Sequence, residues 1–240
     1  MRPLLYQASL VVLLAGAAAA DAAVAGAPKA VKASYTAYMN GMTIGSIAEQ
    51  FEAEGGTYRI VSETRPMGLA TFLQRQPLRF SSTGELTADG LRPAHFEGRR
   101  NAADPPQVSA DFDWGQGQIL MKYNGRAETV PIAAGAQDRL SIMYQFMFAP
   151  QPEKTRQFDF WMTNGRKLDQ YRYRVTPDVE LDTPLGRLKT LHLVKQREPG
   201  SGHAEVWLST QHHYVPVKVV IMERDGMRFE QIIQSLELRD

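Results

Sequence analysis

The histidines are the first residues whose type could support chemistry, because clustered imidazoles can hold zinc. Only His212 and His213 are adjacent, and neighbouring residues of a strand point to opposite faces of a sheet. His192, His203 and one of this pair would meet only if their strands were neighbours. We therefore expect separate surface histidines and no metal site, with the clustered arrangement as the alternative. The five are His95, His192, His203, His212 and His213.

Motifs for nucleophilic or acid–base catalysis are equally sparse. The Gly-x-Ser-x-Gly pattern of serine hydrolases does not occur, and Ser201 and His203 are near neighbours on an expected hairpin loop. Asp111 and Asp113 share one face of an expected strand, where a solvent-facing pair is commoner than a catalytic one. Glycine loops for phosphate and acidic loops for calcium are absent. We predict no catalytic residue, no cofactor and no enzymatic activity; a hydrolase using these aspartates or the histidines is the weaker alternative.

Apolar side chains in and beside one segment have the types that suit a ligand pocket. Methionine is flexible and polarizable, so it adapts to irregular apolar surfaces. A helix rich in Met and Phe, packed against a curled sheet, would line a pocket for an acyl chain or a lipophilic peptide. A helix that simply fills the core is the alternative. The residues predicted to line the pocket are Leu140, Met143, Tyr144, Met147 and Trp161.

The segment that carries most of these residues has helical spacing. Apolar residues recur at positions 140, 143, 144 and 147, and also at 142 and 146, which predicts a helix over about residues 136–148. Asp138 is expected to cap this helix, and Ser141 to satisfy a free backbone group at its start. Because the helix is apolar on most sides, it has to be buried, and the concave face of a sheet is the expected place.

The rest of the chain is typical of antiparallel β-structure. Tight-turn dipeptides such as Asn40-Gly41 and Asn124-Gly125 recur along it, and both residue types accept the positive φ of primed hairpin turns. Between the turns, apolar and polar residues alternate with period two. The sequence therefore predicts a mainly all-β protein. We expect an antiparallel meander of about a dozen strands curled into a half-barrel or barrel, with the helix on its concave face.

The first residues have the pattern of a secretory signal peptide: Arg2, an apolar run, and small residues at the cleavage site. Cleavage near Ala20 or Ala22 would divide the chain into a signal peptide (1–20), a flexible leader (21–31) and a single β-rich domain (32–240). The absence of cysteine argues against a lipoprotein anchor and disulfides. No second apolar run approaches the length of a spanning helix, so we expect a periplasmic protein without a membrane span after cleavage.

The charge balance argues against a nucleic-acid partner. The chain holds 27 Lys and Arg residues against 26 Asp and Glu residues, and loss of Arg2 would make the two counts equal. Binding to nucleic acid depends on a basic excess that neutralises phosphates. The interspersed charges are instead typical of a solvated surface.

Several segments resemble the bacterial secreted family of domain of unknown function 3108 (DUF3108). The most specific are the Gly-Leu-Arg-Pro turn and the Gln-Asp-x-Leu-Ser helix start. The resemblance implies a single periplasmic β-rich domain and brings no catalytic residues with it. The matching segments are 38–45, Gly90-Leu91-Arg92-Pro93, Phe112-Asp113-Trp114, 135–141, Thr163-Asn164-Gly165-Arg166, Thr183-Pro184-Leu185-Gly186, Leu191-His192-Leu193-Val194 and Tyr214-Val215-Pro216-Val217.

These observations favour a non-enzymatic periplasmic binding protein that carries or chaperones a lipophilic small molecule in the cell envelope. The first alternative is a structural protein of envelope biogenesis that docks a protein partner through an edge strand or an apolar patch. The two would be distinguished by what copurifies with the protein.

Overall fold

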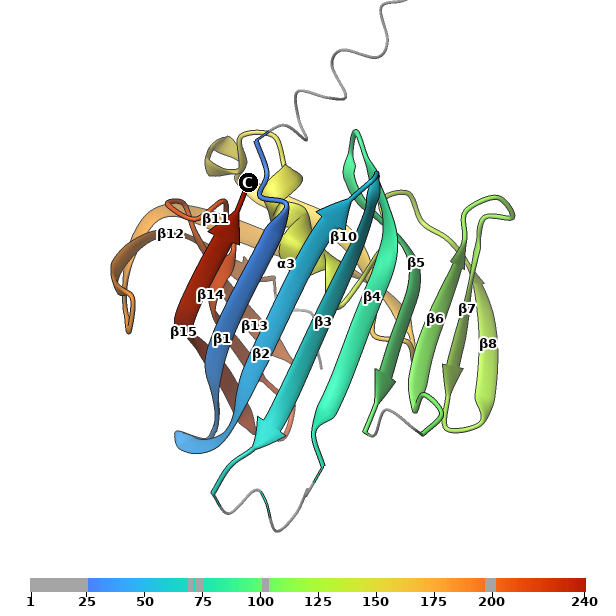
Figure 1. Ribbon diagram of the computed structural model, residues 1–240, viewed down its shortest axis with the longest axis horizontal. Helices are drawn as coiled ribbons and strands as arrows, with labels where there is room; N and C mark the ends of the chain where they lie inside the picture. The colour runs from blue at the N-terminus through green and yellow to red at the C-terminus, as the bar shows by residue number, and fades with distance from the viewer. Residues whose placement is uncertain (1–25, 69–70, 72–75, 101–103, 197–201) are drawn as a thin grey trace, which may run out of the picture.

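A computed structural model describes residues 26–68, 71, 76–100, 104–196 and 202–240. The expected signal peptide and the first half of the expected leader (21–25) lie outside these ranges. The described residues form one 15-stranded sheet, which curls around a short helix (Figure 1). The prediction of a β-rich meander with one helix on the concave face is confirmed, with more strands than the dozen expected.

The elements follow one another along the chain with mostly short connections. The first eight strands are β1 (Ala30–Met39), β2 (Met42–Glu54), β3 (Thr57–Pro66), β4 (Leu78–Thr87), β5 (Gly90–Arg99), β6 (Val108–Asp113), β7 (Gln118–Tyr123) and β8 (Arg126–Pro131). Then come β9 (Gln137–Asp138), α3 (Ser141–Gln145), and the 3₁₀ helices η1 (Phe146–Phe148) and η2 (Pro152–Lys154). The last six strands are β10 (Gln157–Thr163), β11 (Leu168–Thr183), β12 (Gly186–Lys195), β13 (His203–Ser209), β14 (Pro216–Met222) and β15 (Arg228–Arg239).

The topology consists of two meanders joined in the middle of the sheet. The spatial order runs β8 to β1, then β15 to β9, so the first and last strands are neighbours. All pairs are antiparallel except β9 with β10, which is parallel over Met162↔Gln137 and Thr163↔Asp138. The strands β8 and β9 therefore stand at the two ends of the sheet, although they are consecutive in the chain.

The hairpins form where the Asn-Gly dipeptides predict them. Asn40 and Gly41 have φ of 49° and 81°, and Asn124 and Gly125 have φ of 48° and 75°. Positive φ at both central residues matches the right-handed twist of the flanking strands, and Asn and Gly tolerate it best. The turns therefore set the register of β1 with β2 and of β7 with β8.

The predicted helix over about residues 136–148 is wrong in its extent. Gln137 and Asp138 are extended and form β9, and the α-helix proper covers only Ser141–Gln145 before the chain tightens into η1. The reason is tertiary, because the backbone at Gln137 and Asp138 pairs with β10 instead of continuing a helix. Periodicity alone does not reveal such pairing.

The predicted boundary of the leader at residue 31 is also wrong. Ala30 and Val31 belong to β1, where they pair with Arg239 and Leu238 of β15. Val31 is fully buried in the main core. Both residues are therefore part of the sheet, where β1 pairs with β15, and do not belong to a flexible leader.

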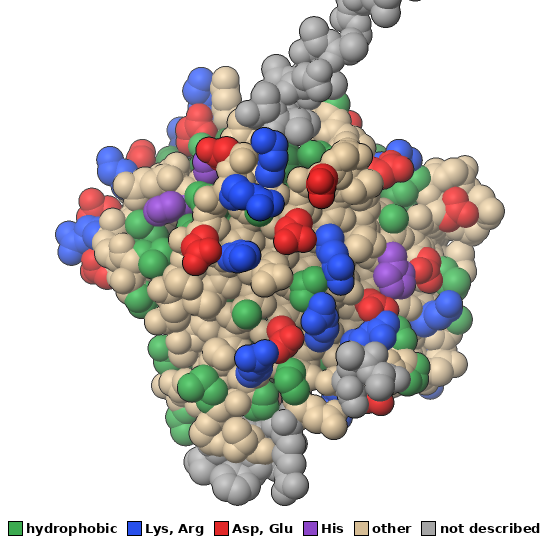
Figure 2. Space-filling model, viewed as in Figure 1, with side chains coloured by type: hydrophobic (Ala, Val, Ile, Leu, Met, Phe, Trp, Pro, Cys, Tyr) green, Lys and Arg blue, Asp and Glu red, His purple; other side chains and the backbone are tan. Residues whose placement is uncertain are grey.

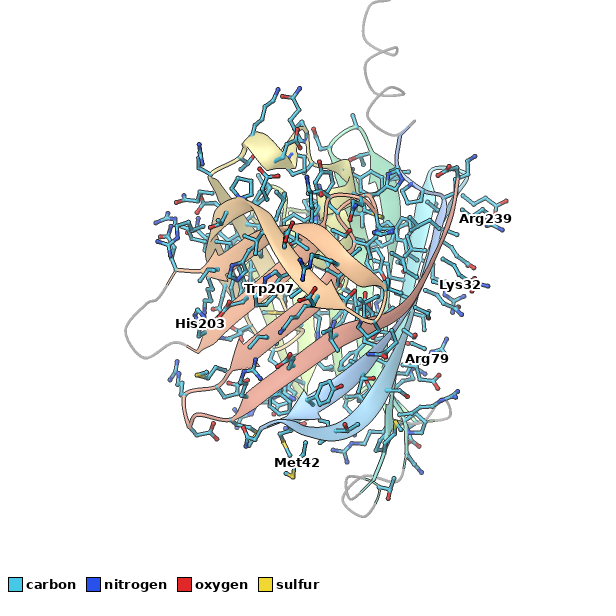
Figure 3. The ribbon with its side chains drawn as sticks, turned by 90° about the vertical axis from the view of Figure 1, so that its left-hand side faces the viewer. Lys32, Met42, Arg79, His203, Trp207 and Arg239 are labelled. Atoms are coloured by element: carbon cyan, nitrogen blue, oxygen red, sulfur yellow. The ribbon has the colours of Figure 1, made fainter. Side chains whose placement is uncertain are left out.

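The two faces of the sheet differ in polarity. On the inner face, Phe51 of β2 stacks on Tyr144 of α3 with ring centroids 5.2 Å apart. The outer face of the first strands carries interspersed acidic and basic side chains (Figure 2). Lys32 and Arg239 lie on this outer side, on β1 and β15 (Figure 3). Burial of α3 on the inner face thus follows from the apolar alternation of the strands around it.

Candidate functional site

Two glutamines tie the helix segment to the turn between β4 and β5. Gln145 of α3 accepts a hydrogen bond from the Leu91 backbone N–H at 2.7 Å through Oε1, and its Nε2 donates to the Asp89 carbonyl at 2.7 Å. Gln137 of β9 donates from Nε2 to the Leu91 carbonyl at 2.8 Å. Gly90 has φ +98°, and a Cβ there would stand 2.5 Å from Gln145 Oε1. The Gly-Leu-Arg-Pro turn and the Gln-Asp-x-Leu-Ser segment therefore form one unit.

Asp138 lies at the centre of a buried polar network below this turn. Its Oδ1 accepts the backbone N–H groups of Leu140 and Ser141 at 2.8 and 3.0 Å, so it caps the turn that leads into α3. Ser82 donates to Asp138 Oδ2 at 2.6 Å, and Tyr58 Oη lies 3.1 Å from Ser82 Oγ. Because Ser82 uses its single proton on Asp138, Tyr58 is the donor in that second bond.

The pKa of the Asp138 carboxyl lies above its ordinary value. Burial raises it, and the hydrogen bonds from Ser82, Ser141 and Leu140 oppose that effect only in part. The same balance holds for Glu49 of β2, where burial raises the pKa against hydrogen bonds from Ser62 and Tyr144. The inner face therefore holds two carboxyl groups that resist ionisation, each fixed by hydroxyl donors.

A pocket of about 590 Å³ opens beside α3, between η1, β10 and the β4–β5 turn. Its volume falls in the range of about 300–1,000 Å³ that is typical of small-molecule sites. Four phenylalanines give it an apolar lining, and Phe146 contacts Phe158 edge-on with centroids 5.2 Å apart. The lining residues are Ala88, Asp89, Gly135, Gln137, Ile142, Gln145, Phe146, Met147, Phe148, Ala149, Pro150, Phe158, Asp159 and Phe160.

Most of the residues predicted to line a pocket are found in packed core instead. Leu140 and Tyr144 are buried in the main apolar cluster, and the partly buried Met143 and Trp161 pack against it. Met147 belongs to the same cluster and also lines the pocket. Of the five residues predicted to line a pocket, Met147 lines it, and the other four pack in the core around it.

The pocket-lining residues that sequence reasoning missed are mainly Gln137 and the phenylalanines. Phe158 and Phe160 alternate along β10 and so share a face, a pattern that predicts burial without saying against what. Phe146 and Phe148 follow α3 in a 3₁₀ turn, which directs them differently from the helical positions assumed. In the sequence, Gln137 stood out only as the first residue of the Gln-Asp-x-Leu-Ser segment that resembles DUF3108.

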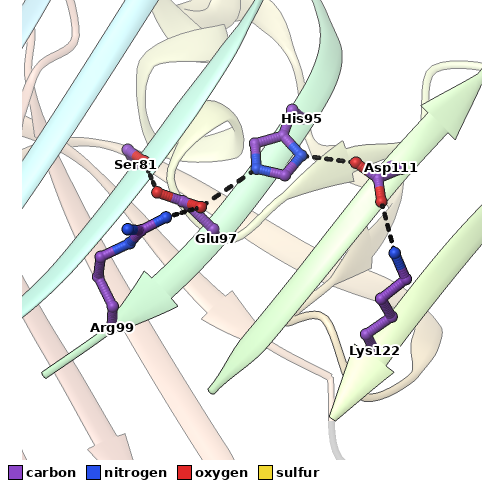
Figure 4. A network of polar contacts seen from close by, with 6 residues as sticks. All are labelled: Ser81, His95, Glu97, Arg99, Asp111 and Lys122. Atoms are coloured by element: carbon purple, nitrogen blue, oxygen red, sulfur yellow. Dashed lines mark hydrogen bonds and ion pairs between the residues drawn. The ribbon is translucent and has the colours of Figure 1, made fainter. Parts of the chain in front are cut away.

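The candidate acids and histidines of the outer face form ion-pair networks. His95 Nδ1 lies 2.6 Å from Asp111 Oδ1, and its Nε2 lies 3.4 Å from Glu97 (Figure 4). Arg99 pairs with Glu97, and Lys122 Nζ lies 3.9 Å from Asp111. These groups are part-exposed on the side of the sheet away from α3. Asp113, the other predicted aspartate, instead accepts a backbone N–H in the β6–β7 turn.

Two other histidines meet on the outer face of the C-terminal meander. His192 and His203 lie 2.7 and 2.9 Å from the two carboxylate oxygens of Glu205. Burial acts to raise the pKa of Glu205, but the hydrogen bonds from both histidines outweigh it, so the pKa lies below its ordinary value. His212 is elsewhere, bonded to Ser209. Within the described ranges, no three His, Cys, Asp or Glu side chains are grouped so as to hold a metal ion.

None of the helices in the described part of the chain has the length and apolar character needed to cross a membrane. The helix α3, for example, spans Ser141–Gln145 only.

The family that the sequence motifs suggest is also the one whose model matches the chain. The model of the family described as protein of unknown function (DUF3108) matches residues 34–231, and the chain belongs to this family. None of the curated proteins matches the sequence significantly.

One solved structure shares the architecture at low sequence identity, and a second aligns more weakly. A β-barrel-like protein of domain of unknown function DUF1849 from Brucella abortus aligns with a TM-score of 0.50 and 10% identity, covering 89% of this chain and 98% of its own. A candidate lipoprotein from Parabacteroides distasonis aligns with a TM-score of 0.35 and 8% identity, over 88% of this chain and 96% of its own. At such identities, the first likeness supports a common fold and leaves activity open.

Proposed function

We propose that this protein is a non-enzymatic binding protein of the periplasm, which carries a lipophilic molecule in the pocket beside α3 and η1. The observation that carries the proposal is the pocket itself. Its volume suits a small molecule, and Phe146, Phe148, Phe158 and Phe160 line it. Aromatic walls bury a large apolar area of a ligand, and that burial is the main source of affinity for such molecules.

The fixed geometry of the pocket also supports binding. Gln145 holds η1 and the β4–β5 turn together through two hydrogen bonds of 2.7 Å. Gly90 allows the close approach, because it has no side chain to displace the Gln145 amide. A pocket whose walls are held in this way loses little entropy when it is occupied. The signal-peptide pattern of the first residues supports the periplasm as the place where the ligand is met.

The proposal excludes catalysis because the polar groups of the pocket lack catalytic arrangements. Gln137, Gln145, Asp89 and Asp159 line it, and a nucleophile paired with a base is not found among these residues. The part-exposed His95–Asp111 pair lies on the opposite face of the sheet. Amide groups orient a ligand but do not act as general acids or bases at neutral pH.

The test is mass spectrometry of the organic extract of protein purified from the cell envelope of its own host. Ala149→Trp is the informative variant, since Ala149 lines the pocket and is half-buried. Ala127→Trp is the matched control, because Ala127 is exposed on β8 and remote from the pocket. We expect a lipophilic compound with the wild type and the control, and its loss with Ala149→Trp. Extracts without any such compound, or with equal amounts from all three proteins, would overturn the proposal.

Docking of a protein partner at the sheet edge has less support. The edge strand β8 is exposed at five of its six positions, but it carries Arg126 and Glu128 and ends in Pro131. Charges and proline on edge strands are features that discourage addition of another strand. Cross-linking in intact cells would favour docking over carriage if one protein neighbour were captured through β8 while the extract stayed free of lipid.

A further inference from the structure

We propose that Arg139 and Arg166 form a second binding site, which takes the phosphate group of a ligand on the inner face of the sheet. This inference goes beyond the proposed function, because the two arginines are separate from the pocket beside α3. Arg139 lies over Phe80, near the start of β4, whereas the β4–β5 turn that lines the pocket follows the other end of that strand (Figure 1).

A row of paired residues forms the floor of this site. Phe80 of β4 pairs with Gly98 of β5, and Gly98 pairs with Val108 of β6. Val108 pairs in turn with Tyr123 of β7. Directly paired residues point to the same face, which is the inner one here because Val108 is buried in the main core. A Cβ at Gly98 would lie 2.4 Å from the Phe80 ring, so the ring leans over β5 towards Tyr123.

Each of the two rings carries a guanidinium group. Arg139, between β9 and α3, places its Cζ 4.5 Å from the centroid of the Phe80 ring. Arg166, in the β10–β11 turn, places its Cζ 4.1 Å from the centroid of the Tyr123 ring. Contact with a ring orients a guanidinium and leaves its N–H groups free to donate. Both arginines are exposed, so a small ligand in solution can reach them.

The chain segments that carry the two arginines are held together at Thr163. The Arg139 backbone N–H donates to the Thr163 carbonyl at 3.1 Å. On the other side, the Gly165 N–H donates to Thr163 Oγ1 at 2.9 Å, directly before Arg166. The backbone at both arginines is therefore fixed before a ligand arrives, which lowers the entropy lost on binding.

Neither guanidinium has a hydrogen-bond or ion-pair partner in the described part of the chain. The pKa of Arg139 lies below its ordinary value, because partial desolvation inside the curve of the sheet lowers it. The charge of Arg166 adds to this effect, against the opposite influence of Glu49 and Asp138. The two cations are thus close enough to repel each other, and an anion bound between them would relieve that repulsion.

The acidic groups nearby do not neutralise the pair. Both oxygens of Glu49 accept hydrogen bonds from hydroxyl groups, at 3.0 and 3.1 Å. Burial raises the pKa of Glu49 and of Asp138, so both resist ionisation. On β8, Arg126 and Glu128 pair with residues of the same face of β7, and their charges offset each other. The site therefore keeps a net positive charge.

Phosphate suits this arrangement better than carboxylate. The two oxygens of a carboxylate are both occupied by the fork of one guanidinium. A phosphate group has at least three acceptor oxygens and can take hydrogen bonds from two guanidiniums at once. Free phosphate and the phosphate of a lipid headgroup share this chemistry.

The experiment measures binding by isothermal titration calorimetry at neutral pH and about 0.15 M NaCl, which screens non-specific attraction. The probes are inorganic phosphate, glycerol 3-phosphate, dihexanoylphosphatidate below its micelle concentration, and acetate. We expect each phosphate compound to bind about tenfold or more tightly than acetate. Tightest binding of dihexanoylphosphatidate would support a lipid headgroup as the source, and equal binding of the three would support the phosphate group alone.

Variants assign the binding to the two arginines. Arg139→Gln and Arg166→Gln should each lower phosphate affinity about tenfold or more, and Arg139→Lys and Arg166→Lys by less, since lysine keeps the charge without the fork. Arg59→Gln is the matched control, because Arg59 is exposed on the outer face of β3. Phosphate should raise the urea midpoint of the wild type and of Arg59→Gln but not that of the other two glutamine variants, whatever their own stability.

The outcomes separate this inference from the proposed function. No binding of any phosphate compound, equal affinity for phosphate and acetate, or unchanged phosphate affinity in both Arg139→Gln and Arg166→Gln would overturn the site and leave the pocket beside α3 in place. Ala149→Trp, which fills that pocket, should leave phosphate affinity unchanged. Loss of phosphate binding in Ala149→Trp would place the anion in the pocket and so overturn the inference.

Discussion

At the scale of single residues, Asp138 connects the most parts of the inner face. Its carboxyl group accepts the N–H groups of Leu140 and Ser141, where the chain enters α3, and the hydroxyl of Ser82 on β4. Ser82 in turn accepts a hydrogen bond from Tyr58 of β3. Asp138 and Ser82 are fully buried. A buried network of this kind stabilises only while every member is paired, so the loss of one acceptor affects several donors.

We predict that Asp138→Ala lowers the free energy of unfolding by about 2–4 kcal/mol, because it removes the cap and leaves buried donors without an acceptor. Asp138→Asn should cost less, since its Oδ1 can still accept the N–H groups of α3. Urea denaturation of the three proteins at pH 7 measures both effects. Equal losses for Ala and Asn would contradict the assigned role of Oδ1.

The raised pKa of Asp138 predicts how stability depends on pH. Because the folded-state pKa lies above the unfolded value of about 3.9, its favourable contribution is complete below that value and is lost as the pH rises through the folded pKa. The stability of the wild type relative to Asp138→Asn should therefore increase as the pH falls from 7 towards 4. Urea midpoints at several pH values test this, and a constant difference would be the contrary result.

The role of a residue could be predicted where it depends on residues close to it in the sequence. The capping by Asp138 depends on Leu140 and Ser141, two and three positions away, so the local pattern suffices to expect it. Its bond to Ser82 spans 56 positions and depends on how β4 passes α3. The hydrogen bond from Gln137 Nε2 to the Leu91 carbonyl could not be predicted either, because it joins residues 46 positions apart.

At the scale of elements, the contact between α3 and the β4–β5 turn shapes the pocket. The helix has only five residues, which is too short to be stable alone, so tertiary contacts must hold it. Gln145 supplies two of these contacts at the turn, and Phe51 stacks on Tyr144 from the sheet. The position of η1, and with it the apolar wall of the pocket, depends on this anchoring.

We predict that Gly90→Ala lowers the free energy of unfolding by about 2–3 kcal/mol, from strain at φ +98° and from the clash with the Gln145 amide. Gly186→Ala is the matched control. Its φ is +101° with no atom within 4 Å of the added Cβ, so it should cost only about 1 kcal/mol. Thermal and urea unfolding compare the two. Losses of the same size would mean that Gln145 moves aside freely.

Element prediction succeeded for hairpins and failed at the helix limits. The Asn-Gly turns require a backbone conformation that few other residues adopt, so residue type alone locates them. The segment from Gln137 to Phe148 has a helical pattern throughout, yet strand pairing takes its start and a 3₁₀ turn its end. Both departures come from partners distant in the sequence, which a local pattern does not contain.

At the scale of the whole molecule, the ladder between β1 and β15 joins the two meanders. Val31 and Tyr35 of β1 and Ile233 of β15 are buried along it. Tyr35 also reaches past β15 and donates a hydrogen bond to the Pro216 carbonyl of β14 at 2.9 Å. The overall β-rich curl was predictable from the alternation along the strands, but the pairing of these two strands was not, because no turn connects them.

We predict that Ile233→Ala lowers the free energy of unfolding by about 2–5 kcal/mol, the range for a large aliphatic side chain removed from a packed core. Val130→Ala on the edge strand β8 should cost about 1 kcal/mol or less, because Val130 is only half-buried. Chemical denaturation of both variants gives the comparison. Similar losses at the two positions would contradict a central role for the β1–β15 ladder.

The pairing of β1 with β15 also determines how early the fold can be completed. Ser34 and Ser235 hydrogen-bond at 2.6 Å although 201 positions separate them. A ribosome must therefore make almost the whole domain before β1 gains its second neighbour, and closing so long a loop is slow. Until then, β1 presents an open edge to proteases and to other nascent chains. Protection by chaperones would be needed most during this interval, until the last strand reaches the compartment in which the first one waits to pair.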